Sequence, residues 1–198
     1  NMPSRYHGSI AGSLSYAFIL NGQPDSAIHY RRKSFHSFND SLVPDRIIKT
    51  EGLYEYGYFM REYFNWDSSF FYMNEALRMS QEMSFNFGIF MAANRMGNYF
   101  YGLGDFDKAI DYYKPAEENA VKVNATGFAF SDEKYRRAPV WIWDLHIRSM
   151  TPRSLKVTTK GILVQIYRRL SQAMEKKGEP GMALEYFKQY FAFTDTLN

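Results

Sequence analysis

A short phrase that recurs four times along this 198-residue chain constrains its fold more than any other feature. The copies occupy residues 25–30, 67–72, 107–112 and 181–186, each with a small residue in third place. These small residues, Ala27, Ser69, Ala109 and Ala183, are 42, 40 and 74 positions apart. A recurrence of this period is typical of repeat proteins, in which one supersecondary unit is copied along the chain.

The longest gap between two copies indicates one further, degenerate repeat. Its 74 positions are twice 37, and Pro115 and Pro152 within it are also 37 apart. Gly88, Gly127 and Gly161 each precede a run with helical periodicity. We therefore expect one domain over residues 1–198, with repeats at about 8–42, 48–84, 88–123, 125–160 and 162–198, the fourth degenerate.

Each clear copy of the phrase follows a signal for a tight turn between two helices. Gly22, Gly104 and Gly178 can adopt a positive φ and end a helix, and Phe64-Asn65 stands at the same place in the second unit. Upstream of these turns the apolar residues recur at helical spacing, and alternation typical of strands is absent. The sequence therefore predicts an all-α chain built from helix-turn-helix units.

These units resemble the tetratricopeptide-repeat (TPR) family. The third unit matches its pattern through Met96, Gly97, Phe100, Ala109 and Tyr113, and the first and fifth units match through Ser15 with Ala27 and Ser171 with Ala183. The resemblance implies a right-handed superhelical solenoid of about five repeats. It also implies that Ala109 and Ala183 lie at close helix contacts and that Phe18, Phe100, Tyr113 and Phe187 belong to the core.

Composition and motifs favour binding over catalysis. The chain has no cysteine, a net charge of only +3 and four histidines without metal-ligand spacing. We found no catalytic motif, phosphate-binding loop or recurring base-reading pair, and we expect no enzyme activity, no cofactor and no nucleic-acid partner. No stretch approaches the ~18 uncharged apolar residues of a membrane span, so we expect no membrane contact by this segment.

In TPR proteins the first helices line a concave groove, and carrying that surface over predicts a polar and aromatic binding site for a protein or peptide. Its candidate residues are Tyr16, Glu51, Tyr54, Tyr58, Arg61, Asn94, Asn98, Tyr101, Arg168 and Gln172. Asn98 and Arg168 resemble members of the carboxylate clamp with which some TPR domains hold a peptide C-terminus. The alternative is that these side chains are solvated or stabilise neighbouring helices.

The C-terminal segment from Ala183 to Leu197 resembles the last repeat of TPR sensor regions in bacterial signalling proteins. That resemblance implies a sensing or dimerising region, outside the cytoplasmic membrane, in which a second copy of the chain is a further candidate partner. The alternative hypothesis is a free-standing assembly or chaperone-type adaptor that clamps a peptide tail. The flanking sequence would separate the two, because a sensor needs a membrane helix and an output domain downstream.

Overall fold

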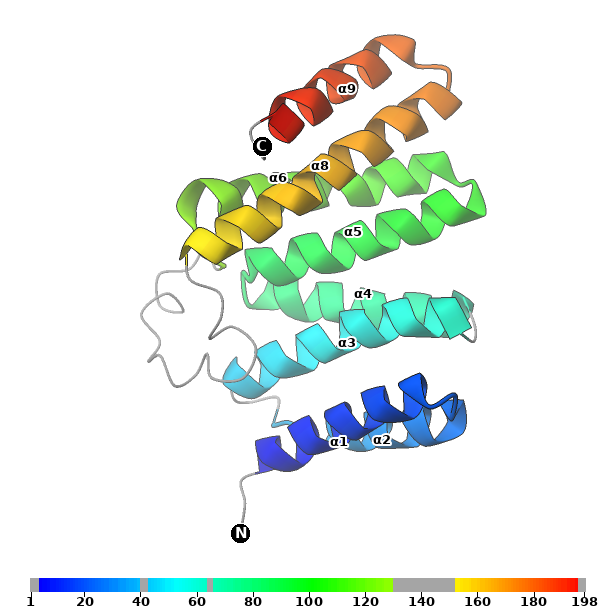
Figure 1. Ribbon diagram of the computed structural model, residues 1–198, viewed down its shortest axis with the longest axis vertical. Helices are drawn as coiled ribbons and strands as arrows, with labels where there is room; N and C mark the ends of the chain where they lie inside the picture. Colours follow the sequence, from blue (N-terminus) through cyan, green and yellow to red (C-terminus); the bar gives the residue numbers. More distant parts are fainter. Residues whose placement is uncertain (1–3, 40–42, 64–65, 130–151, 196–198) are drawn as a thin grey trace. The chain divides into compact units, whose positions relative to one another are not determined.

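The structure, a computed structural model, describes residues 4–39, 43–63, 66–129 and 152–195, which form helices joined by short turns. Its helices are α1 (Ser4–Leu20), α2 (Pro24–His36), α3 (Val43–Tyr63), α4 (Trp66–Glu82), α5 (Asn86–Leu103), α6 (Phe106–Thr126), α8 (Pro152–Lys176) and α9 (Pro180–Asp195) (Figure 1). No strand occurs in these ranges. The all-α prediction is therefore confirmed for them.

The helices belong to two compact units, Asn1–Met79 and Ser80–Asn198. In the first unit α1 packs against α2. In the second, α5, α6, α8 and α9 lie side by side in this order, each helix packed on the next (Figure 1). The expectation that all residues form one domain stays a prediction.

Three of the predicted turns have the same geometry. Gly22, Gly104 and Gly178 have φ angles of 66°, 78° and 77°, a left-handed conformation that glycine adopts without steric cost. Each donates its N–H to the carbonyl three residues earlier, and the next residue donates to the carbonyl five residues earlier, as from Asp105 to Phe100 over 3.0 Å. These paired hydrogen bonds end the helix before each turn. Phe64-Asn65 lies outside the described residues.

A second shared feature is a close contact between the two helices of a hairpin, at positions 12 residues apart. The hydroxyl of Ser15 donates to the carbonyl of Ala27 over 2.8 Å, and that of Ser171 donates to Ala183 over 2.8 Å. In α3 and α4 the roles are exchanged, because Ser69 donates to the carbonyl of Gly57 over 2.7 Å. The small residues of the recurring phrase are therefore those that let two helices approach.

The hairpin of α5 and α6 makes this approach without a hydroxyl. Gly97 lies 12 positions before Ala109. A Cβ on Gly97 would lie 2.6 Å from the ring of Tyr113, so only glycine lets that ring lie flat against α5. Aromatic pairs also recur 12 residues apart: the rings of Phe18 and Tyr30 stack at 5.1 Å and those of Phe100 and Tyr112 at 5.4 Å.

The core prediction is confirmed for two residues, only partly met by a third and wrong for the fourth. Phe100 and Tyr113 are buried, whereas Phe18 is half-buried. Phe187 is 46% exposed. The physical reason is its position on α9, the last helix described, whose outer side is not covered by a further helix among the described residues.

The predicted boundary between the fourth and fifth repeats lies inside a helix. Gly161, which we expected just before a new helix, is in the middle of the 25-residue α8. Gly127 instead ends α6 with a φ of 72°. Residues 130–151, most of the predicted fourth repeat, lie outside the described ranges.

Candidate partner-binding surface

Two of the three predicted groove residues of the first unit whose side chains are described are buried. Tyr16 on α1 is 59% exposed, but Glu51 and Tyr54 on α3 are buried. The expectation that Glu51 and Tyr54 can be reached by a ligand is therefore wrong, because neighbouring side chains cover this face of α3. The side chains of Tyr58 and Arg61 lie outside the described residues.

Glu51 shows the electrostatic consequence of that burial. Removal from water raises the pKa of its carboxyl to about 7, and the nearby charge of Glu55 adds to the increase. With this pKa the carboxyl is only partly ionised at neutral pH, and because it is buried it is not presented to a cationic ligand. Glu51 thus belongs to the interior of the first unit.

Arg31, part of the basic triplet Arg31-Arg32-Lys33, is also packed into the first unit. Its guanidinium lies 5.5 Å from the ring centre of Tyr56 and 5.9 Å from that of Phe35, in cation–π contact with both. Burial lowers the pKa of Arg31 from its ordinary value. This arginine serves packing and is not presented to a phosphate.

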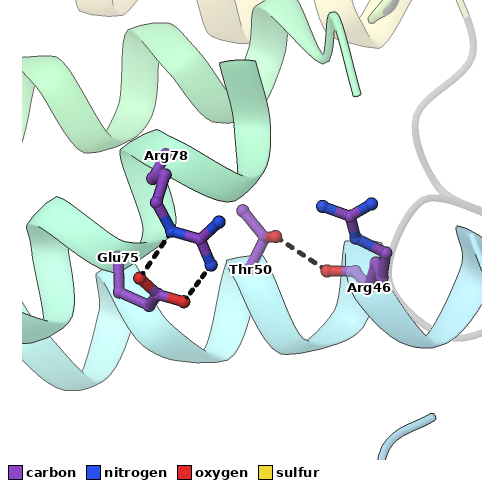
Figure 2. A network of polar contacts seen from close by, with 4 residues as sticks. All are labelled: Arg46, Thr50, Glu75 and Arg78. Atoms are coloured by element: carbon purple, nitrogen blue, oxygen red, sulfur yellow. Dashed lines mark hydrogen bonds and ion pairs between the residues drawn. The ribbon is translucent and has the colours of Figure 1, made fainter. Parts of the chain in front are cut away.

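Two further polar contacts of the first unit lie within single helices. Figure 2 shows the hydroxyl of Thr50 donating to the carbonyl of Arg46 along α3, over 2.7 Å. On α4 two nitrogens of the Arg78 guanidinium donate hydrogen bonds to the carboxylate of Glu75, and the Nε to Oε2 distance is 2.9 Å (Figure 2). Such contacts one turn apart stabilise a helix and do not assemble a site.

The second unit does bring several predicted residues together. The ring of Tyr101 on α5 meets Phe106 edge-on at 5.5 Å, and the guanidinium of Arg169 on α8 lies 4.7 Å above it. Arg169 also donates to the side-chain oxygen of Gln172, over 3.5 Å. These contacts join Tyr101, Arg169 and Gln172. We use the name Tyr101 surface for these three residues together with Asn98, one turn before Tyr101 on α5, and Arg168, next to Arg169 on α8.

The remaining members of this surface differ in how far they are available. Asn98 is half-buried, and its side-chain oxygen accepts a hydrogen bond of 2.8 Å from the hydroxyl of Tyr113. The amide nitrogen of Asn98 is the donor that this bond does not use. Arg168 is exposed. Asn94 is buried within α5, so the expectation that it lines an accessible groove is wrong.

Sequence reasoning missed Arg169. It selected Arg168, one position earlier, from the register of the first helices, and one position is a rotation of about 100° around a helix. The only local signal for Arg169 is Gln172, one turn further along α8. The contact with Tyr101 joins two hairpins and could not be read from either one alone.

Contacts between hairpins fix the position of α8 beside α6. The ammonium of Lys177 pairs with Asp107 at the start of α6 over 2.7 Å and with Glu179 over 3.1 Å. Further along, the hydroxyl of Tyr167 hydrogen-bonds to the carboxylate of Glu117. Burial raises the pKa of Tyr167 to about 12 and raises that of Glu117. These contacts hold the two sides of the Tyr101 surface in register.

A basic depression of about 580 Å³ lies elsewhere on the second unit, between the end of α6 and the start of α8. It is lined by Asn124, Pro152, Arg153, Lys156, Val157 and Lys160. Its three cations recur along one side of α8 and favour anionic groups. We had not predicted this depression from the sequence.

The described ranges hold no group of three histidine, aspartate or glutamate side chains placed to bind a metal ion. Nor does any helix within them combine the length and apolar character needed to cross a bilayer.

Comparison with known proteins adds no relative: no family model matches the chain, and no curated protein matches it significantly.

Proposed function

We propose that this chain is a TPR-type helical repeat protein that binds a protein or peptide partner and does not catalyse a reaction. The support is geometric. Three hairpins share the same glycine turn and the same pair of turn hydrogen bonds, and two of them share the serine contact between residues 12 positions apart. Units that repeat in this way present their first helices in equivalent orientations and so build a continuous surface.

The Tyr101 surface is where we place the partner. The observation that carries this choice is the guanidinium of Arg169 over the ring of Tyr101, which joins first helices from two different hairpins into one surface. Tyrosine and arginine are the side chains most often found at energetic centres of interfaces, because both offer a flat apolar body with polar edges.

The polar groups around Tyr101 indicate the chemistry of the partner. Arg168 and Arg169 supply positive charge, and the amides of Asn98 and Gln172 supply hydrogen-bond donors. These groups suit a carboxylate, either a peptide C-terminus or an acidic side chain. We therefore propose an extended peptide segment with a carboxylate as the partner of this surface.

Binding of labelled peptides tests this proposal. Mixed-sequence peptides, made with a free or an amidated C-terminus, would be titrated against the protein by fluorescence anisotropy. We expect the best binders to weaken by about 30-fold, or ~2 kcal/mol, in Tyr101→Ala. Arg168→Ala should weaken the free-acid peptides more than the amidated ones.

Phe71→Ala is the matched control, because it removes an exposed aromatic ring of the first unit that is not among the predicted groove residues. It should bind the same peptides as the parent does. Unchanged affinity in the Tyr101→Ala, Arg168→Ala double variant, together with lost affinity in Tyr190→Ala, Phe193→Ala, would move the site to α9. Absence of sequence-dependent binding by any peptide would contradict the proposed function itself.

A further inference from the structure

We infer that the chain associates head to tail with a second copy of itself, the outer face of α9 in one copy packing on α1 of the next. The outer face of α9 is a stripe of Leu184, Phe187 and Phe191, which are 52%, 46% and 50% exposed. The rings of Phe187 and Phe191 touch edge-on at 4.9 Å. Apolar side chains one turn apart that remain in water mark a surface that another element covers.

The packing of α6 shows what covers such a stripe. Ala109 and Ala183 each stand five positions after the glycine of their turn, so Leu184, Phe187 and Phe191 stand where α6 has Ile110, Tyr113 and Glu117. Ile110 and Tyr113 are buried, whereas Leu184 and Phe187 stay exposed although their own first helix, α8, is in place. Glu117 is hydrogen-bonded to Tyr167 of α8, the first helix of the next hairpin. The equivalent face of α6 is therefore covered by the first helix of the following hairpin.

The exposed side of α1 supplies the matching half. Ser15 and Ser171 make the same contact within their hairpins, so Ile10 and Leu14 stand where α8 has Ile166 and Leu170. Ile166 and Leu170 are fully buried, whereas Ile10 is 51% exposed and Leu14 is also exposed.

The neighbours of α8 show which helix buries these two residues. α8 packs mainly against α6 and α9. In the matching hairpin of α1 and α2, Ile10 and Leu14 stay exposed although α2 is in place, so α9 is not the helix that buries Ile166 and Leu170. Their side of α8 is the one that packs on α6.

The two open faces are thus the two halves of the contact between α6 and α8. α9 presents the face that α6, the second helix of its hairpin, uses in this contact. α1 presents the face that α8, the first helix of its hairpin, uses. Because the two halves differ, the contact between copies is heterologous, and it leaves one free face at each end of a pair. Association should therefore proceed beyond a dimer as concentration rises.

Sedimentation velocity on the full chain, from about 1 to about 300 µM, tests the inference. The parent should form a concentration-dependent series of oligomers. Phe187→Glu places a charge in the apolar face of α9, and Ile10→Glu places one in the apolar face of α1. Each variant alone should therefore be monomeric. An equimolar mixture should give a dimer and nothing larger, because each variant keeps the face that the other lacks.

Phe71→Glu changes an exposed phenylalanine on α4 and should assemble as the parent does. All variants replace exposed residues, and circular dichroism confirms their folding; Leu184→Glu substitutes for Phe187→Glu if that variant unfolds. A parent that stays monomeric at every concentration, as expected if another protein covers α9, overturns the inference. So does a monomeric mixture, or an Ile10→Glu variant that still dimerises through two α9 faces.

Discussion

The hairpin of α5 and α6 and the hairpin of α8 and α9 are built alike but differ in what covers them. Both turn at a glycine with positive φ, and both have a buried alanine five positions after that glycine, Ala109 and Ala183. Yet Tyr113 of α6 is fully buried, and Phe187 at the same place on α9 is not. The same local pattern therefore gives a core residue or a surface residue, depending on the presence of a following helix.

The largest expected effect of this difference is on stability. Tyr113→Ala should lower the free energy of unfolding by about 3–5 kcal/mol, because it empties a fully buried site against Gly97 of α5. Phe187→Ala should cost less than about 1 kcal/mol, since the ring is half in water already. Urea denaturation followed by circular dichroism measures both. Equal losses would mean that the two positions are equally covered.

The buried carboxyl of Glu51 gives a test of burial on α3, the first helix of another hairpin. Its pKa in the folded chain, about 7, exceeds its ordinary value of 4.5, so the unfolded chain releases the proton first as the pH rises. Stability should therefore fall between about pH 4.5 and pH 7. Glu51→Gln should match the parent at pH 4 and exceed it by roughly 2–3 kcal/mol at pH 8.

Thermal melts at the two pH values measure the effect of Glu51→Gln. Glu175→Gln, which replaces an exposed glutamate on α8, is the control, and it should melt like the parent at both pH values. A Glu51→Gln variant no more stable than the parent at pH 8 would show that this carboxyl is in contact with water.

Replacing the small residue of each hairpin by a larger one tests whether the two hairpins also differ at the contact between their own helices. Ala109→Leu should destabilise by about 2–3 kcal/mol, because α6 is held between α5 and α8 and cannot move away. Ala183→Leu should cost about 1 kcal/mol, since α9 has an open side toward which it can shift. Parent-like melting of both variants would show that these residues do not lie at helix contacts.

The turns should show the smallest effect and no difference between hairpins. Gly104→Ala and Gly178→Ala force alanine into the left-handed region and should each cost about 1 kcal/mol. Gly161→Ala is the matched control within α8, where a Cβ would meet no atom, and it should stabilise by about 0.5–1 kcal/mol. A clear difference between the two turn variants would mean that the turns are not equivalent.

The sequence was sufficient to predict the features that depend on neighbours along the chain. Gly22, Gly104 and Gly178 end helices because no other residue adopts their φ so readily. Ala27, Ser69 and Ala183 of the repeated phrase lie at helix contacts because each stands opposite the residue 12 positions earlier, on the preceding helix.

Features that depend on packing between hairpins were not predicted. Glu51, Tyr54 and Asn94 lie in a polar register on first helices, but neighbouring elements bury them. Arg169 was missed because its partner, Tyr101, is in another hairpin. Glycine was also ambiguous: Gly88 is needed for a close approach to Phe85, whereas Gly161 lies within a continuous helix.

Thiol labelling of single cysteines at equivalent positions is the most direct test of the difference between the covered and the open hairpin. The chain has no cysteine, so Ile110→Cys and Leu184→Cys each introduce a unique thiol. At a concentration low enough to keep the protein monomeric, Leu184→Cys should react with a maleimide nearly as fast as a free thiol. Ile110→Cys should react at least ~100-fold more slowly, because its side chain is reached only when α6 and α8 separate. Equal rates at the two positions would contradict the account.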